Sequence, residues 1–195
     1  MNHEEARRIV DSLGVSPLES LFLRGVAWHE TNYGQGWKPG SGEGSNNMGA
    51  ITTKKPDQYS FQHADVRNDQ GQVVHYTTWF KGYKTPRQGF EDLKHTVLRP
   101  NVKAGIARAG LRGGLAAMHE NGYFLGVHRR DTAAGREANV TDYFNAVVKG
   151  LHTIGASTRE DVQKLISHVG HSAWALVAAT AAAIAGGLAF WRFAR

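Results

Sequence analysis

Apolar residues at helical spacing define the first predicted element of the chain. Leu23, Val26 and Ala27 fall on one helical face, and Glu30 lies on the same face. The Ser-Pro-Leu-Glu sequence at 16–19 supplies a capping serine, a proline suited to the first helical position and a glutamate that can close a capping box. We therefore predict a helix that begins at this cap and continues through Glu30.

The glutamate on this face is a candidate proton donor. We expect the helix to end near Gly34, a good left-handed terminator, and to expose the opposite side, which carries Arg24 and Thr31. Glu30 then lies at the edge of the core, next to Trp28. Burial disfavours the charged form of a carboxyl and raises its pKa, so a proton stays available for general acid catalysis near neutral pH. The alternative is a surface glutamate that caps a polar loop.

A β-hairpin is predicted between this helix and the next. Residues 72–80 are rich in Val, Thr and aromatic side chains, and the Asn-Asp-Gln-Gly sequence at 68–71 is a turn signal. We place the hairpin at about 61–80. The Thr-Pro-Arg-Gln sequence at 85–88 is a second capped helix start, and a short helix is expected at 115–121. The predicted fold is mainly helical with one small hairpin insertion.

The C-terminal segment predicts a transmembrane helix. Residues 172–191 contain no charged side chain, and twenty helical residues cover about 30 Å, roughly the thickness of the bilayer core. Trp174 and Trp191 stand near its two ends. A buried, alanine-rich helix is the alternative. Small residues on one face of the segment could allow self-association through close helix pairing.

The predicted domain organisation has four parts. They are a catalytic domain at 1–155, an amphipathic linker helix at 156–171, the transmembrane helix at 172–191 and a basic tail at 192–195. The Asn-His-Glu-Glu sequence at 2–5 resembles a helix cap rather than the positive start of a signal peptide.

Composition narrows the possible chemistry. The 195 residues include no cysteine, so disulfide and thiolate chemistry are excluded, and the ten histidines show no metal-ligand spacing. The glycine-rich segment at 40–44 lacks the ending of a phosphate-binding loop. We expect no metal and no cofactor. The formal net charge of +6 suits an anionic polymer or a membrane surface. The basic residues are dispersed and no nucleic-acid motif is present, so nucleic acid is not an expected partner.

Five motifs in order resemble the glucosaminidase family of bacterial autolysins and flagellar peptidoglycan hydrolases, in the lysozyme-like superfamily. They are Trp-His-Glu-Thr-Asn-Tyr-Gly at 28–34, Ser-Asn-Asn-Met-Gly-Ala-Ile at 45–51, Phe-Lys-Gly-Tyr at 80–83, Gly-Tyr at 122–123 and Val-Thr-Asp-Tyr-Phe at 140–144. The resemblance implies an α+β lysozyme-like fold. It also implies cleavage of the β-1,4 bonds of peptidoglycan, whose glycan strands are then the expected partner.

The resemblance also implies site residues. Glu30 corresponds to the general acid, and Tyr123 corresponds to the tyrosine that lines the cleft beside it. Asp65 stands where the family usually has a second acidic residue, a glutamate, on the first strand of the hairpin. Asp69, Asp57 and Glu43 are weaker candidates because they lie in turns or loops. Candidate substrate contacts are Tyr33, Asn47 and Tyr83.

Three reaction outcomes stay open. Asp65 could act as the base for an inverting attack by water, the N-acetyl group of the substrate could attack, or the 6-hydroxyl of the muramic sugar could attack and give lytic transglycosylation. An inactive, membrane-anchored wall-binding or virion structural protein is the alternative. The predicted transmembrane helix implies a membrane-anchored domain that acts on the cell wall. Because the segment at 2–5 does not resemble a signal peptide, a phage virion component, carried in a particle with an internal membrane, is one explanation of how the protein reaches the wall.

Overall fold

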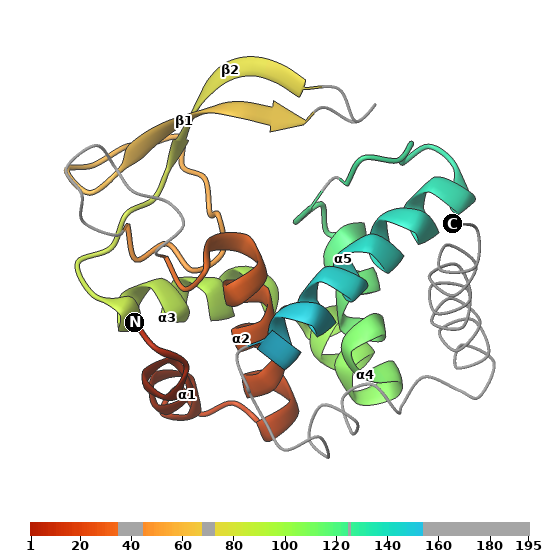
Figure 1. Cartoon of the computed structure of the whole chain (residues 1–195), viewed down its shortest axis with the longest axis horizontal. Helices are drawn as coiled ribbons and strands as arrows, with labels where there is room; N and C mark the ends of the chain where they lie inside the picture. The colour runs from red at the N-terminus through yellow and green to blue at the C-terminus, as the bar shows by residue number, and fades with distance from the viewer. Residues whose placement is uncertain (35–44, 68–72, 125, 154–195) are drawn as a thin grey trace, which may run out of the picture.

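The computed structural model describes residues 1–34, 45–67, 73–124 and 126–153, and only the backbone at 63–67 and 73–78. This part forms helices and one two-stranded antiparallel sheet (Figure 1). In chain order the elements are α1 (His3–Asp11), α2 (Pro17–Thr31), β1 (Phe61–Arg67), β2 (Val73–Phe80), α3 (Pro86–Val97), α4 (Pro100–Glu120) and α5 (Ala133–Thr153).

The predicted fold class is wrong as stated, because it included a transmembrane helix. No helix among the described residues is long and apolar enough to cross a bilayer. Residues 172–191, to which the prediction applied, lie outside the described part of the chain. The fold that the structure supports is mainly helical with a small two-stranded sheet. The linker helix at 156–171 and the domain boundary at 155 also fall outside the described residues and stay predictions.

Helix α2 is the central helix of the fold, since α1, α3, α4 and α5 all contact it. Its predicted start is confirmed: Ser16 and Glu19 form the capping box, and a proline occupies the first turn. The expectation that Arg24 and Thr31 face solvent is wrong, because they are only 6% and 2% exposed. Neighbouring helices cover this side as well, and the Arg24 guanidinium donates to Nε2 of His3 at 3.1 Å.

The end of α2 lies at Thr31, earlier than the predicted end near Gly34. Asn32 forms the C-cap in the left-handed conformation, with φ 50° and ψ 50°. Asparagine adopts this conformation more readily than most residues, so it takes the role expected of glycine. Glu30 therefore lies in the last turn of the helix.

Glycines allow α2 and α5 to pack closely against each other. A Cβ atom on Gly25 would lie 2.8 Å from Cγ1 of Val147, and one on Gly150 would lie 2.5 Å from Cδ1 of Trp28. Any larger side chain at either glycine would force the two helices apart. This close approach brings α5 against the helix that carries Glu30.

The hairpin is confirmed at its predicted place. Phe61 pairs with Phe80 at its base, and the register shifts between His63 and Asp65. The preceding loop runs beside the end of β2, where the N–H of Thr53 donates to the carbonyl of Trp79 at 2.8 Å. The hairpin exit and this loop are thus held together.

Helix α4 is longer than the short helix predicted at 115–121. It begins at Pro100 and bends at Ala109 and Gly110, whose backbones are not helical. Gly110 has φ 57° and ψ −144°, a region that only glycine enters readily. Beyond the bend, the Arg112 guanidinium of α4 donates to Oγ1 of Thr141 on α5 at 3.0 Å.

Candidate active site

Glu30 lies in the last turn of α2 and faces α5. The Tyr143 hydroxyl donates a hydrogen bond to its Oε1 atom. Burial raises the pKa of Glu30 to about 7, and the hydrogen bond from Tyr143 opposes part of this rise. The carboxyl therefore holds its proton up to neutral pH while part of the residue is still exposed. This is the protonation state that a general acid needs.

Two aromatic contacts fix the ring of Tyr143. Phe124 stacks on it with ring centroids 4.1 Å apart, and His29 meets it edge-on at 4.5 Å. Burial raises the pKa of Tyr143 well above 10, and the nearby Glu30 adds to the rise. Tyr143 is thus a neutral hydrogen-bond donor to Glu30.

Tyr143 belongs to the Val-Thr-Asp-Tyr-Phe motif at 140–144, but the sequence did not indicate it as a site residue. Helical spacing within 140–144 could not show which residue of α5 reaches α2. The only available signal was the presence of a polar aromatic residue in that motif.

Tyr123 also lies near the carboxyl of Glu30. Its hydroxyl donates to the carbonyl of Gly49 at 2.6 Å. Burial raises the pKa of Tyr123 well above 10, and the neighbouring Glu30 and Tyr83 raise it further. The structure therefore brings together the two residues predicted as acid and cleft tyrosine. It also connects them to the Ser-Asn-Asn loop through Gly49.

Gly49 has no room for a side chain at this point. A Cβ atom there would lie 2.4 Å from the hydroxyl oxygen of Tyr123 and 2.4 Å from Cδ1 of Leu93. The glycine of the Ser-Asn-Asn-x-Gly motif is thus required for the contact between the loop and Tyr123.

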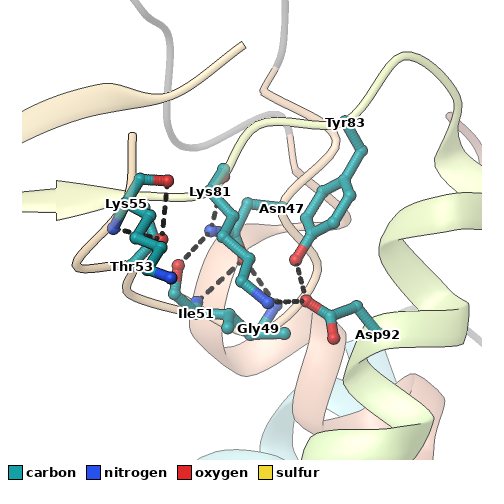
Figure 2. A network of polar contacts seen from close by, with 8 residues as sticks. All are labelled: Asn47, Gly49, Ile51, Thr53, Lys55, Lys81, Tyr83 and Asp92. Carbon is teal, nitrogen blue, oxygen red and sulfur yellow. Dashed lines mark hydrogen bonds and ion pairs between the residues drawn. The ribbon is translucent and has the colours of Figure 1, made fainter. Parts of the chain in front are cut away.

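Asn47, a predicted substrate contact, is fully buried within this loop. Its amide nitrogen donates to the carbonyls of Ile51 and Lys81, at 3.0 and 2.9 Å. Its Oδ1 atom accepts from the N–H groups of Gly49 and Ile51 (Figure 2). An asparagine side chain has two donor hydrogens and one acceptor oxygen, and all of them are used here. Asn47 therefore shapes the loop, and the predicted sugar contact stays untested.

Tyr83 belongs to a polar cluster on the other side of the loop. Its hydroxyl donates to Oδ2 of Asp92 on α3, and the Lys81 ammonium lies 2.7 Å from the same oxygen (Figure 2). Burial and the Asp92 carboxylate raise the pKa of Tyr83. Neither Lys81 nor Asp92 was a candidate site residue in the sequence. Both are partly exposed charges in ordinary positions, and only the fold joins them.

Tyr33 lies in the core rather than on the surface. It is 2% exposed and meets the ring of Trp28 edge-on at 5.4 Å. Its hydroxyl is hydrogen bonded to Nδ1 of His3 at 3.0 Å. The structure thus gives Tyr33 a packing role, and nothing tests its predicted contact with sugar.

The structure describes only the backbone of Asp65, the predicted second acidic residue. Asp65 pairs with His75 in the hairpin, next to the register shift. Its side chain is outside the described part of the structure, as are Glu43 and Asp69. Asp57 forms an exposed turn in which its carboxylate accepts from the N–H of Tyr59 at 2.9 Å, and such bonds lower its pKa. The catalytic role of Asp65 stays a prediction.

No group of three or more His, Asp or Glu side chains in the described residues could hold a metal ion. The chemistry that this part of the site offers is a protonated carboxyl beside two neutral tyrosines. Such a group can protonate a leaving oxygen.

The fold is similar to that of a solved peptidoglycan hydrolase. A crystal structure of a peptidoglycan hydrolase mutant from Sphingomonas sp. A1 matches with a TM-score of 0.50 and 20% identity, over 77% of this chain and 94% of that chain. A C-terminally truncated glycoside hydrolase domain of FlgJ from Salmonella typhimurium matches with a TM-score of 0.46 and 16% identity, over 78% of this chain and 93% of that chain. No protein-family model and no curated protein sequence matches the chain. The predicted resemblance to peptidoglycan hydrolases is thus confirmed at the level of the fold by the Sphingomonas structure.

Proposed function

We propose that this protein is a glycosidase that cleaves β-1,4 bonds of the peptidoglycan glycan, with Glu30 as the general acid. The observation that carries the proposal is the Glu30 carboxyl, whose pKa burial raises to about 7 beside the hydroxyl of Tyr143. The fold shared with a Sphingomonas peptidoglycan hydrolase supports the substrate class. The proposal includes no membrane anchor.

The reaction begins with proton transfer from Glu30 to the glycosidic oxygen. The bond between that oxygen and the anomeric carbon breaks, and its electron pair stays with the leaving sugar. Positive charge develops on the anomeric carbon in an oxocarbenium-like transition state. The carboxylate left on Glu30 is then stabilised by the hydrogen bond from Tyr143.

The attacking group decides the product. Water activated by Asp65 gives inversion, the substrate's own N-acetyl group gives a cyclic intermediate that water opens, and the 6-hydroxyl of the muramic sugar gives an anhydro product. These three alternatives differ in the ends of the released glycan or in their anomeric configuration. They can therefore be distinguished by the masses of the fragments together with the configuration of the new reducing end.

The test uses the full-length chain and purified peptidoglycan, with Glu30→Gln beside the wild type. Mass spectrometry of the released fragments should show new glycan ends with the wild type and none with Glu30→Gln. Reducing glucosamine or muramic ends identify a hydrolase, and anhydromuramic ends identify a lytic transglycosylase. If neither protein releases fragments but both sediment with the wall, the protein is a binder and the glycosidase proposal is wrong.

A further inference from the structure

The carboxyl of Glu30 is held by the protein at one oxygen. Tyr143 donates to Oε1, and no described residue forms a hydrogen bond with Oε2. In a protonated carboxyl the carbonyl oxygen is the better hydrogen-bond acceptor, so a donor at one oxygen favours the proton on the other. The contact with Tyr143 therefore distinguishes the two oxygens of the acid.

We infer that Tyr143 is a positioning residue that keeps the acidic proton of Glu30 on Oε2 and stabilises the carboxylate after that proton has left. This inference rests on the proposed function. The proton on Oε2 passes to the glycosidic oxygen, and the electrons of the broken C–O bond go to the leaving sugar. Tyr143 keeps its own proton throughout and donates the same hydrogen bond before and after the transfer.

The surroundings of Tyr143 support this role. Its ring is held by Phe124 at 4.1 Å and by His29 at 4.5 Å, so the position of the hydroxyl does not depend on Glu30. Burial raises the pKa of Tyr143 well above 10, which excludes it as an acid near neutral pH. The hydrogen bond becomes charge-assisted, and therefore stronger, when Glu30 is ionised.

Other titratable groups around the carboxyl do not replace this donor. Tyr123 lies close enough to interact electrostatically with Glu30, but its hydroxyl donates to the carbonyl of Gly49. Burial lowers the pKa of His29, which favours the neutral form of this neighbour. Asp142, which precedes Tyr143 on α5, is paired with another side chain, His128, at 2.9 Å.

The first test measures the titration of Glu30 directly. In the full-length chain labelled with ¹³C at glutamate carboxyls, NMR should place the wild-type midpoint of Glu30 near 7. Tyr143→Phe keeps the ring and removes only the hydroxyl. Because one pKa unit is about 1.4 kcal/mol and a charge-assisted hydrogen bond is of at least that size, the midpoint should rise by about one pH unit. The exposed Tyr59 supplies the matched control, Tyr59→Phe, which should leave the midpoint in place.

A midpoint that stays in place or falls in Tyr143→Phe would overturn the inference. If this variant does not fold, the inference is tested in the wild type alone. There the chemical shift of the ¹³Cζ resonance of Tyr143 should change with pH at the same midpoint as the carboxyl of Glu30. A Tyr143 chemical shift that does not change as Glu30 titrates also overturns the inference.

The second test measures cleavage of peptidoglycan. Tyr143→Phe should lower kcat about tenfold with KM unchanged, and should move the alkaline limb of the pH profile upward with the NMR midpoint. A purely structural role would lower activity without moving that limb. A wild type that cleaves no glycan contradicts the proposed function, while the NMR titration still tests Tyr143. If the wild type cleaves glycan but the alkaline limb of the pH profile stays in place in Tyr143→Phe, the role of Tyr143 is contradicted and the proposed function is not.

Discussion

Replacing Glu30 with glutamine should stabilise the folded protein above neutral pH. Burial raises the pKa of Glu30 from 4.5 to about 7, so between these values the folded state keeps a proton that the unfolded chain has released. The contribution of Glu30 to stability therefore falls as the pH rises through this interval and stays low above it. Glutamine carries no charge at any of these pH values, and its carbonyl oxygen can still accept from Tyr143.

The size of the effect follows from the two pKa values. The difference between 4.5 and about 7 corresponds to about 3 kcal/mol in the free energy of unfolding. Because Glu30 is partly exposed and solvent screens its charge, we expect about 2 kcal/mol. A change of 1 kcal/mol moves the Tm of a protein of this size by roughly 2–4 °C. Glu30→Gln should therefore melt roughly 4–8 °C above the wild type at about pH 8 and close to it at about pH 4.

The assay is calorimetric or chemical unfolding of both proteins across this pH range. The exposed residue Glu120 gives the matched control, because Glu120→Gln removes the same charge from a solvated position. This control should show no comparable pH-dependent increase in Tm. A Glu30→Gln effect on Tm that is equal at all pH values, or a wild type that is the more stable protein at about pH 8, would contradict a raised pKa of Glu30 in the folded protein.

Two further substitutions test close contacts of the site. Gly49→Ala places a Cβ atom 2.4 Å from the hydroxyl oxygen of Tyr123, so it should displace that hydroxyl. We expect the free energy of unfolding to fall by about 1–3 kcal/mol and glycan cleavage to decrease. An unchanged free energy of unfolding together with unchanged activity would contradict the contact. Gly150→Ala places a Cβ atom 2.5 Å from Cδ1 of the rigid indole of Trp28, and should also cost about 1–3 kcal/mol in chemical unfolding. Since alanine otherwise favours a helix over glycine, a gain in stability would show that α2 and α5 pack less closely than described.

The sequence predicted the features that depend on neighbouring residues. The capping box at Ser16 and the one at Thr85 are local motifs, and both are present in the structure. The burial of Glu30 was also predictable, since the residue follows the apolar face of one helix. Such features need no knowledge of how distant segments meet.

The remaining features depend on tertiary packing. Arg24 was predicted to face solvent because it is charged, but helices cover α2 on that side as well, and the carbonyl of Ser20 accepts from its guanidinium. The contact of Tyr143 with Glu30 spans 113 positions in the sequence and depends on how α5 crosses α2. Asn47 was predicted to contact sugar, and no sequence pattern showed that its amide would be used within the loop.

The most direct test of Glu30 as the general acid is the rate of peptidoglycan cleavage as a function of pH, measured for the wild type and for Glu30→Gln. If Glu30 is the general acid, the wild-type rate falls as the pH rises through about 7, where Glu30 loses its proton, and Glu30→Gln is inactive throughout. Equal rates for the two proteins, or a wild-type rate that keeps rising above about pH 8, would contradict Glu30 as the general acid.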